Sequence, residues 1–239
     1  MKRVGIVGFG SFGKFLAEKL GPYAQVLVYS PSGKLSQWAS DLDQVAKTDY
    51  LIFAIPLDSY PVMLERVKPL ILAETTIVDV CSVKEEPVAI IRSILPNHKL
   101  VATHPLFGPE SADDSLAGHV LVLCPDVSDE RALKEVEKFA LDLQLKVEIM
   151  SAREHDQEMA TVQGLTFFIA HILKDCHIHN LRLNTPSFKR LLHLAQLEQH
   201  HSDDLFITIQ TGNQQTKTVR NQFISIATKL NDKLNNHSR

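Results

Sequence analysis

The chain has 239 residues, of which 44% are hydrophobic and 22% charged, and its formal net charge is −3. This length allows one domain of about 150 residues with a smaller second one, and the composition is typical of a folded protein. The small negative charge and the lack of a Lys/Arg stripe exclude nucleic acid as an expected partner. No segment resembles a membrane span or a signal peptide, and the three cysteines have no C-x-x-C spacing, which favours reduced thiols and a cytoplasmic location.

A glycine-rich turn directly follows the first predicted strand, residues 4–7, and reads Gly8-Phe9-Gly10-Ser11-Phe12-Gly13. A helical pattern begins at Phe12, so the order is strand, G-x-G-x-x-G and helix, as in a dinucleotide-binding fold. Gly8 would allow the tight turn, Gly10 the approach of the pyrophosphate, and Gly13 the close packing of helix on strand. The first N–H groups of the helix, from Ser11 onward, would face the phosphates.

The end of the second predicted strand, residues 25–29, bears on which cofactor binds. An NAD-binding fold usually has an acidic residue there for the ribose hydroxyls. Here the chain continues with Ser30, Ser32 and Lys34, and the next acid is Asp41. Two hydroxyls and an ammonium suit a 2′-phosphate, so NADP is favoured over NAD; a polar turn that accepts either cofactor is the alternative.

Alternating strands and helices continue to about residue 150. The further predicted strands cover residues 51–55, 76–80, 100–103, 120–124 and 146–150. Ser82 follows the strand at 76–80, where it could cap the next helix or contact a substrate. His104 follows the fifth strand in a turn with two prolines and a glycine, and we expect this turn to hold the imidazole rigidly at the sheet edge where ligands bind.

The pattern becomes purely helical after residue 150. A capping box from Ser151 to Glu154 predicts a helix to about Cys176. Further helices are predicted from Pro186 and from Ser202, the last with a weak point at Gly212. The predicted fold is therefore α/β, with a Rossmann dinucleotide-binding domain at 1–150 and an all-α substrate and dimerisation domain at 151–239. This helical part has little core of its own, so it should dock on the first domain or pair with a second subunit.

Two histidine groups, His177-x-His179 and His200-His201, could suggest a metal site. Neither group has a cysteine or carboxylate at ligand spacing. No metal is therefore expected.

Taken in order, the motifs resemble those of the prephenate/arogenate dehydrogenase family of tyrosine biosynthesis. The resemblance covers essentially the whole chain, and its specific part, which runs from Thr103 to Ser111, is most like the plant-type arogenate dehydrogenases. Those enzymes mostly use NADP. The matching segments are the glycine motif, Phe53-Ala54-Ile55-Pro56, Asp79-Val80-Cys81-Ser82-Val83-Lys84, Thr103-His104-Pro105-Leu106-Phe107-Gly108-Pro109-Glu110-Ser111 and Glu154-His155-Asp156.

The resemblance implies a role for individual residues. His104 would accept the proton of the substrate's ring hydroxyl, and Ser82 would help to orient that histidine. Ala54, Ile55 and Pro56 would contact the cofactor. The substrate would be bound by Thr103, Glu110, Ser111, Asp114 and Gln163, with Asp114 facing the amino group of arogenate. The family also implies a homodimer through the C-terminal helices.

The chain departs from the family in its helical part. Many relatives have a histidine at the position of Phe167, and here His171 lies one turn further on. The substrate-binding arginine has no secure equivalent, and Lys189 and Arg190 are the candidates. Two alternatives therefore stay open: a related two-domain NADP-dependent reductase of a hydroxy acid or imine, and an NADP-binding module that has lost its activity.

Overall fold

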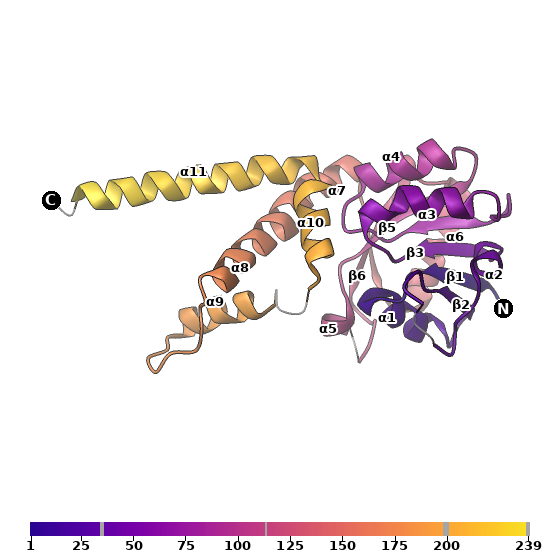
Figure 1. Ribbon diagram of the computed structural model, residues 1–239, viewed down its shortest axis with the longest axis horizontal. Helices are drawn as coiled ribbons and strands as arrows, with labels where there is room; N and C mark the ends of the chain where they lie inside the picture. The colour runs from indigo at the N-terminus through magenta and orange to yellow at the C-terminus, as the bar shows by residue number, and fades with distance from the viewer. Residues whose placement is uncertain (34–35, 113, 198–200, 238–239) are drawn as a thin grey trace. The chain divides into compact units, whose positions relative to one another are not determined.

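Among the described residues, seven strands form one sheet in the first part of the chain, and the second part contains helices joined by loops (Figure 1). The computed structural model describes residues 1–33, 36–112, 114–197 and 201–237. The chain divides into two units, Met1–His155 and Asp156–Arg239. The first turn of the helix that begins at Ala152 packs with the sheet unit, because Ala152 is buried in one of its cores.

The sheet has the strand order β2-β1-β3-β4-β5-β6-β7. All neighbouring strands are parallel except β5 and β6, which run antiparallel. β1 lies between β2 and β3, so the chain reverses its direction of travel across the sheet at this point, and such a switch is where open α/β sheets bind ligands. The strands are β1 Arg3–Val7, β2 Gln25–Tyr29, β3 Tyr50–Phe53, β4 Thr76–Asp79, β5 Lys99–Pro105, β6 Val120–Cys124 and β7 Lys146–Ile149.

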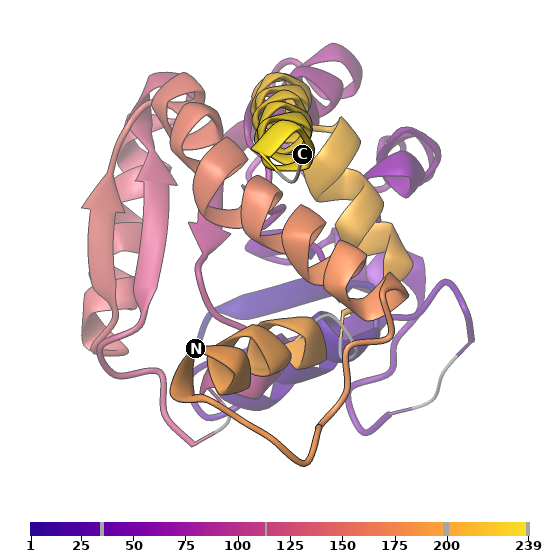
Figure 2. The same cartoon turned by 90° about the vertical axis from the view of Figure 1, so that its left-hand side faces the viewer.

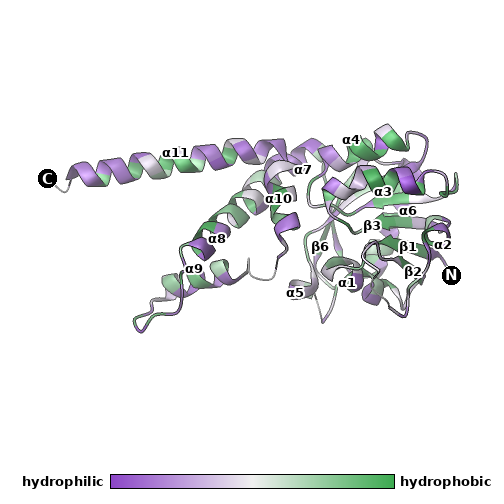
Figure 3. Ribbon diagram, viewed as in Figure 1, coloured by the Kyte–Doolittle hydropathy of each residue, from purple (hydrophilic) through white to green (hydrophobic). Residues whose placement is uncertain are grey.

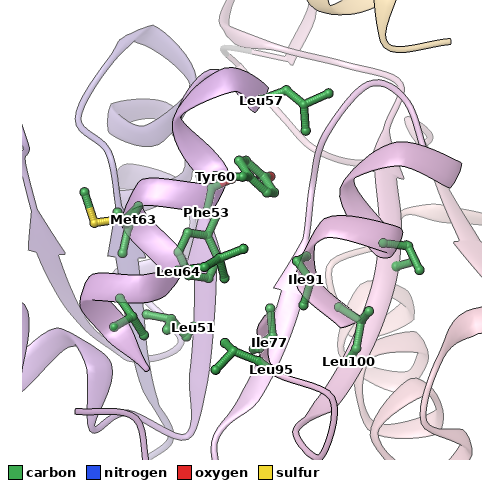
Figure 4. Packing of buried hydrophobic residues seen from close by; sticks show 14 of the residues in the cluster. Leu51, Phe53, Leu57, Tyr60, Met63, Leu64, Ile77, Ile91, Leu95 and Leu100 are labelled. Carbon is green, nitrogen blue, oxygen red and sulfur yellow. The ribbon is translucent and has the colours of Figure 1, made fainter. Parts of the chain in front are cut away.

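Helices cover both faces of the sheet because the central strands are apolar on both sides. One core lies under α2 Leu42–Ala46, α3 Tyr60–Val67 and α4 Glu85–Ile94, where Phe53, Tyr60 and Leu64 pack together (Figure 4). The other core lies under α1 Ser11–Leu20 and α6 Glu130–Asp142. Two short helices, η1 Leu57–Ser59 and α5 Pro109–Ala112, follow β3 and β5, and η2 Pro125–Val127 follows β6.

His104 lies inside β5 rather than after it, which corrects the predicted position. Its Cα is paired with Val122 of β6, and Pro105 is paired with Leu121. The antiparallel neighbour β6 reaches past the end of β4, so it extends β5 beyond residue 103, where the apolar run ends. The imidazole is therefore held by sheet pairing and not by the proline-glycine turn alone.

The helical unit begins within a continuous helix that changes its winding. α7 Ala152–Met159 passes into a π-helical segment, Ala160–Leu165, and then into α8 Thr166–Asp175. The predicted capping box is confirmed, because the Ser151 N–H donates to Glu154 Oε2 at 2.9 Å and the Glu154 N–H donates to Ser151 Oγ at 3.1 Å. The π segment did not follow from the sequence pattern.

The remaining helices are α9 Pro186–Leu197, α10 Asp203–Thr211 and α11 Gln214–His237. Ser202 caps α10 by accepting from the Leu205 N–H, and the break between α10 and α11 includes the predicted weak point, Gly212. Figure 2 looks along α11, and Figure 3 shows that most of this helix is hydrophilic whereas the central strands are hydrophobic.

The predicted fold class is confirmed, with the reversed β6 as a feature that the strand–helix alternation did not reveal. Cys81, Cys124 and Cys176 form no disulfide bond among the described residues. Within the described ranges, no helix is long and apolar enough to cross a membrane.

Candidate active site

Two glycines of the turn after β1 lie so close to neighbouring backbone atoms that a side chain would not fit. Gly8 has φ +113, and a Cβ there would lie 2.1 Å from the carbonyl oxygen of Ala54. A Cβ on Gly13 would lie 2.3 Å from the carbonyl oxygen of Gly8. Both positions therefore require glycine, the first for its backbone angle and its neighbour and the second for the contact of α1 with the turn.

Gly10 differs from these two glycines because a Cβ there would meet nothing within 4 Å. Packing therefore does not require a glycine at this position. The missing side chain instead leaves the backbone of the turn open to a ligand. α1 has Gly10 as its N-cap without a side-chain cap, and the first bond of the helix runs from the Lys14 N–H to the Gly10 carbonyl. The N–H groups of Ser11, Phe12 and Gly13 thus precede the first helical bond and fit an anionic pyrophosphate.

The loop after β3 borders the same turn. The Ala54 N–H donates to the Val7 carbonyl at 2.8 Å, and the Gly8 N–H donates to the Tyr29 carbonyl at 2.8 Å. Ala54 and Ile55 are half-buried, and Pro56 is exposed. The three predicted cofactor contacts on this loop therefore lie at the switch point between β1 and β3, beside the glycine turn.

The end of β2 presents two of the three predicted phosphate ligands. Ser30 Oγ and Ser32 Oγ lie 3.2 Å apart, and Lys34 lies outside the described residues. An arginine that sequence reasoning missed is also present: Arg66 of α3 donates to the Tyr29 hydroxyl at 2.8 Å, and its guanidinium carbon lies 5.5 Å from the centre of the Tyr29 ring. It is 37 residues away from Tyr29, so no local pattern could have indicated it.

His104 is paired with a second histidine. Its Nδ1 lies 2.8 Å from Nε2 of His155, and the two rings meet edge to face with centroids 5.0 Å apart. Both side chains are buried, with residue exposures of 3% and 0%. Burial lowers the pKa of His104 well below its usual range, and His155 and the Lys84 ammonium lower it further. His104 is therefore a neutral imidazole at pH 7 and can accept a proton.

Ser82 follows β4 at the carboxyl end of the strand, as predicted. It is half-buried after β4, and within the described part of the chain its hydroxyl makes no hydrogen bond, so the ring of His104 is oriented by His155. The alternative in which Ser82 caps the next helix is wrong, because the N-cap of α4 is Lys84. The backbone before Ser82 is instead bonded to the Asp79 carboxylate, whose Oδ1 accepts from the Cys81 N–H at 3.1 Å.

A buried ion pair joins Asp79 at the end of β4 to Lys84 at the start of α4, and both side chains are fully buried. The Lys84 ammonium also donates to the Thr103 carbonyl, and the Tyr60 hydroxyl donates to Asp79 Oδ1 at 3.2 Å. Burial raises the pKa of Asp79, while Lys84 opposes this, and burial also raises the pKa of the Cys81 thiol to about 12. Both residues belong to the segment from Asp79 to Lys84 that resembles the family, but their spacing in the sequence did not indicate that they pair.

The predicted substrate residues near His104 divide into buried and exposed groups. Thr103 is buried, and its hydroxyl donates to the Asp79 carbonyl at 2.8 Å, so this hydroxyl is bonded within the sheet. Ser111 Oγ accepts from the Gly108 N–H at 3.0 Å and closes the turn into α5. Glu110 and Asp114 are exposed.

The π-helical segment of the helical unit contains Gln163, the last predicted substrate residue. Its Oε1 is buried and has no hydrogen-bond partner among the described residues. The neighbouring Gly164 carbonyl accepts from Gln210 Nε2 at 2.7 Å, and Gln210 Oε1 in turn accepts from Arg220 at 2.7 Å. Short π segments are frequent at functional sites, and an orphaned buried oxygen is costly, so this segment is suited to receive a donor from a ligand.

The residues that depart from the family pattern all lie in the helical unit. Phe167 stacks on His201 at 4.7 Å, and His171 stacks on Phe206 at 4.2 Å. Lys189 and Arg190 are exposed on α9. Sequence reasoning missed Arg220, whose guanidinium lies 5.8 Å from the centre of the Phe168 ring and bonds to Gln210.

Metal-ligand side chains do not cluster in groups of three or more in the described ranges, and His200 lies outside those ranges.

Known proteins resemble this chain in sequence and in fold. Residues 33–149 match the family model described as "Prephenate dehydrogenase, nucleotide-binding domain". Arogenate dehydrogenase 1 (chloroplastic) of Arabidopsis thaliana is 30% identical over 222 residues, which cover 85% of this chain and 34% of that protein. Arogenate dehydrogenase 2 (chloroplastic) of the same plant is 28% identical over 221 residues, covering 85% and 62%.

Among solved structures, the fold resembles a prephenate dehydrogenase from Aquifex aeolicus in complex with hydroxyphenyl propionate and NAD+. Its TM-score is 0.77 at 21% identity, and the likeness covers 100% of this chain and 92% of that one. This likeness concerns the fold alone. The chain spans about a third and about three fifths of the length of the two plant relatives.

The glycine turn generates a matched pair of substitutions. Gly10→Ala should leave the melting temperature unchanged, because its methyl group meets open space, yet weaken cofactor binding by about tenfold or more by standing where the pyrophosphate approaches. Gly13→Ala should lower the free energy of unfolding by roughly 1–3 kcal/mol, because its methyl group meets the Gly8 carbonyl. Thermal unfolding and cofactor titration of both variants measure this, and an equal loss of stability in the two would contradict it.

Proposed function

We propose that the chain belongs to the prephenate/arogenate dehydrogenase family and catalyses the oxidative decarboxylation of arogenate or prephenate in tyrosine biosynthesis. Residues 33–149 match the nucleotide-binding domain of prephenate dehydrogenases, and two plant arogenate dehydrogenases are similar over 85% of this chain. The observation that carries this proposal is the neutral, buried His104 in the same sheet unit as the glycine turn, with its Nδ1 already bonded to His155. A related hydroxy-acid or imine reductase would more naturally use a catalytic lysine or aspartate of the helical domain.

The chemistry asks for one proton acceptor and one hydride acceptor. Nε2 of His104 accepts the proton of the ring hydroxyl as the hydride leaves the carbon that bears it. The bound nicotinamide supplies the hydride acceptor. Loss of the ring carboxylate as carbon dioxide then gives the aromatic product, so the protein mainly positions and polarises the substrate. Because burial and two neighbours keep His104 unprotonated, the base is in its active form at neutral pH.

For the cofactor we propose NADP. Ser30, Ser32 and Lys34 follow β2 without an acidic residue among them. The guanidinium of Arg66 on the Tyr29 ring adds a positive charge beside the end of β2. A 2′-phosphate is matched by such a set of hydroxyls and cations, whereas a carboxylate for ribose hydroxyls is missing from it.

For the substrate we propose arogenate over prephenate, with Asp114 as the residue that selects it. The two molecules differ at one carbon, which bears an ammonium in arogenate and a keto oxygen in prephenate. A carboxylate pairs with the first and is left unmatched by the second. Asp114 is exposed in the loop after α5 and so can contact a ligand. Glu110, Ser111 and Gln163 complete the proposed substrate contacts.

We further propose a homodimer through the C-terminal helices. From residue 224 onward, α11 exposes four large apolar side chains, and packing against a second subunit would remove them from water. A molar mass in solution of about twice 26.8 kDa, measured by light scattering, would support it. The exposed side chains are Ile224, Ile226, Leu230 and Leu234.

The activity is tested with arogenate, prephenate and a panel of hydroxy acids, by following the formation of NADPH. The parent should act on arogenate or prephenate and not on the hydroxy acids. His104→Asn should lower turnover by about a hundredfold or more while cofactor affinity stays the same. Because the pKa of His104 lies well below 6.5, kcat/KM should not fall between pH 8 and pH 6.5. Undiminished turnover in His104→Asn would mean that this histidine is structural.

The cofactor preference is tested by titrating NADP and NAD into the parent and into Ser30→Asp. The parent should bind NADP more tightly, and the substituted carboxylate should reverse the order by repelling the 2′-phosphate and accepting from ribose hydroxyls. Ser36→Asp, a few residues further along the same loop, is the control for added negative charge. Equal affinities for both cofactors in the parent would remove the NADP assignment.

Substrate choice is tested by Asp114→Asn, which removes the charge and keeps the shape. The ratio of kcat/KM for arogenate to that for prephenate should fall by about tenfold if the Asp114 carboxylate pairs with the substrate ammonium. Asp126→Asn would not serve as a control because Asp126 anchors α7, so Asp142→Asn on the exposed end of α6 is used. An unchanged ratio would show that Asp114 does not select the substrate.

A further inference from the structure

The hydrogen bond between His104 and His155 constrains which nitrogen can do chemistry. Nδ1 of His104 is occupied by Nε2 of His155 at 2.8 Å. Nε2 of His104 has no hydrogen bond to any residue that the structure describes. A substrate can therefore reach His104 only through Nε2.

One proton lies between the two rings when both are neutral, and its position decides the chemistry. With the proton on Nδ1 of His104, Nε2 of that ring carries a lone pair and can accept. With the proton on Nε2 of His155, the neutral His104 must carry its own proton on Nε2 and can only donate. The heavy-atom geometry is the same in both cases, so the function rests on the tautomer.

We propose that His155 is a positioning residue that holds the proton on Nδ1 of His104 and so turns the Nε2 lone pair toward the substrate's hydroxyl. This inference rests on the proposed dehydrogenase function and adds the device that prepares its base. It requires His155 to present an unprotonated Nε2 and therefore to carry its own proton on Nδ1.

The backbone around His155 is fixed strongly enough to serve this purpose. It lies in the first turn of α7, where its N–H donates to the Ser151 carbonyl at 2.9 Å. The reciprocal bonds of Ser151 and Glu154 close the start of that turn. The Ala152 N–H donates to Asp126 Oδ1 at 3.0 Å, which ties the turn to the segment after β6. His155 is thus anchored to the sheet unit on the same side as its partner on β5.

An uncharged orienting partner also suits a base in this location. In serine proteases a carboxylate orients the histidine and stabilises its protonated form. A carboxylate here would make His104 more basic and favour its protonation before substrate binds. A neutral imidazole orients the ring without that effect, while Lys84 and burial oppose protonation. Once Nε2 has taken the substrate's proton, the bond from Nδ1–H to His155 becomes charge-assisted and spreads the new charge.

The tautomer is measured by ¹⁵N NMR of the histidine rings in the protein with cofactor and without substrate. The signals of His104 are assigned by their loss in His104→Asn. The parent should show a protonated Nδ1 and an unprotonated Nε2. His155→Leu removes the acceptor, so His104 should shift toward the tautomer with its proton on Nε2, which histidine side chains favour in water. His155→Gln keeps an acceptor oxygen at similar reach and should retain the parent tautomer.

The kinetic measurement separates positioning from mere packing. His155→Leu should lower kcat by about tenfold to a hundredfold with the KM for NADP unchanged, because the hydrogen bond that it removes is strongest when His104 has taken up the substrate's proton. His155→Gln should recover most of this loss. His98→Gln, at a half-buried histidine elsewhere in the sheet unit, is the control and should match the parent.

Three results would overturn the proposal: a parent His104 with its proton on Nε2, a folded His155→Leu variant with the parent tautomer and parent kcat, or a Gln variant as impaired as the Leu variant. If His155→Leu does not fold, the parent tautomer and the Gln variant still decide. A parent that turns over neither arogenate nor prephenate would refute the dehydrogenase function, whereas the tautomer measurement would stand by itself.

Discussion

The ion pair between Asp79 and Lys84 is the constraint on which the site depends. Removing two charges from water costs several kcal/mol each, and their attraction offsets this only where the remaining hydrogen bonds are also made. Here they are made: the Asp79 carboxylate accepts from Tyr60 and from the Cys81 N–H, and the Lys84 ammonium donates to the Thr103 carbonyl. The pair therefore ties the end of β4, the start of α4 and the end of β5 into one network.

The network fixes both the position and the charge of His104. The Thr103 carbonyl belongs to the residue directly before the histidine, so the ammonium holds the backbone from which the imidazole projects. The same ammonium adds positive charge near a ring that is already buried, and both effects lower the pKa of His104. The antiparallel partner β6 completes the support by pairing Val122 with His104. Position and protonation state thus follow from one set of contacts.

Sequence patterns predicted the features that are local in the chain. The glycine turn, the capping box at Ser151, the alternation of strands and helices and the break near Gly212 all depend on neighbours within a few residues. Three features depend on tertiary pairing instead. The reversed β6 lengthens β5 past the apolar run, so His104 falls inside the strand. The guanidinium of Arg66 reaches Tyr29 from another element, and His155 reaches His104 across 51 residues.

The contact between His155 and His104 shows why the family motifs alone did not predict the whole site. His155 stood in a quoted family segment, but a histidine at the start of a helix is ordinary in sequence, and only the fold brings its Nε2 to the Nδ1 of His104. Ser82, in contrast, stood at the expected rim of the sheet, yet the chain there follows the Asp79 carboxylate and leaves its hydroxyl without a bond to His104. The sequence therefore indicated the correct edge of the sheet, but the residue that hydrogen-bonds to His104 is His155 and not Ser82.

Stability alone does not explain why a charged pair occupies this place. Replacing both members of a buried ion pair by apolar side chains of similar volume is often neutral or stabilising, whereas removing one member costs about 3–5 kcal/mol. A leucine pair could therefore close the gap between β4 and α4. It could neither bond the Thr103 carbonyl nor place a positive charge near the imidazole. Both contacts help His104 to remain unprotonated, so the ion pair suits the role as a base that we propose for His104.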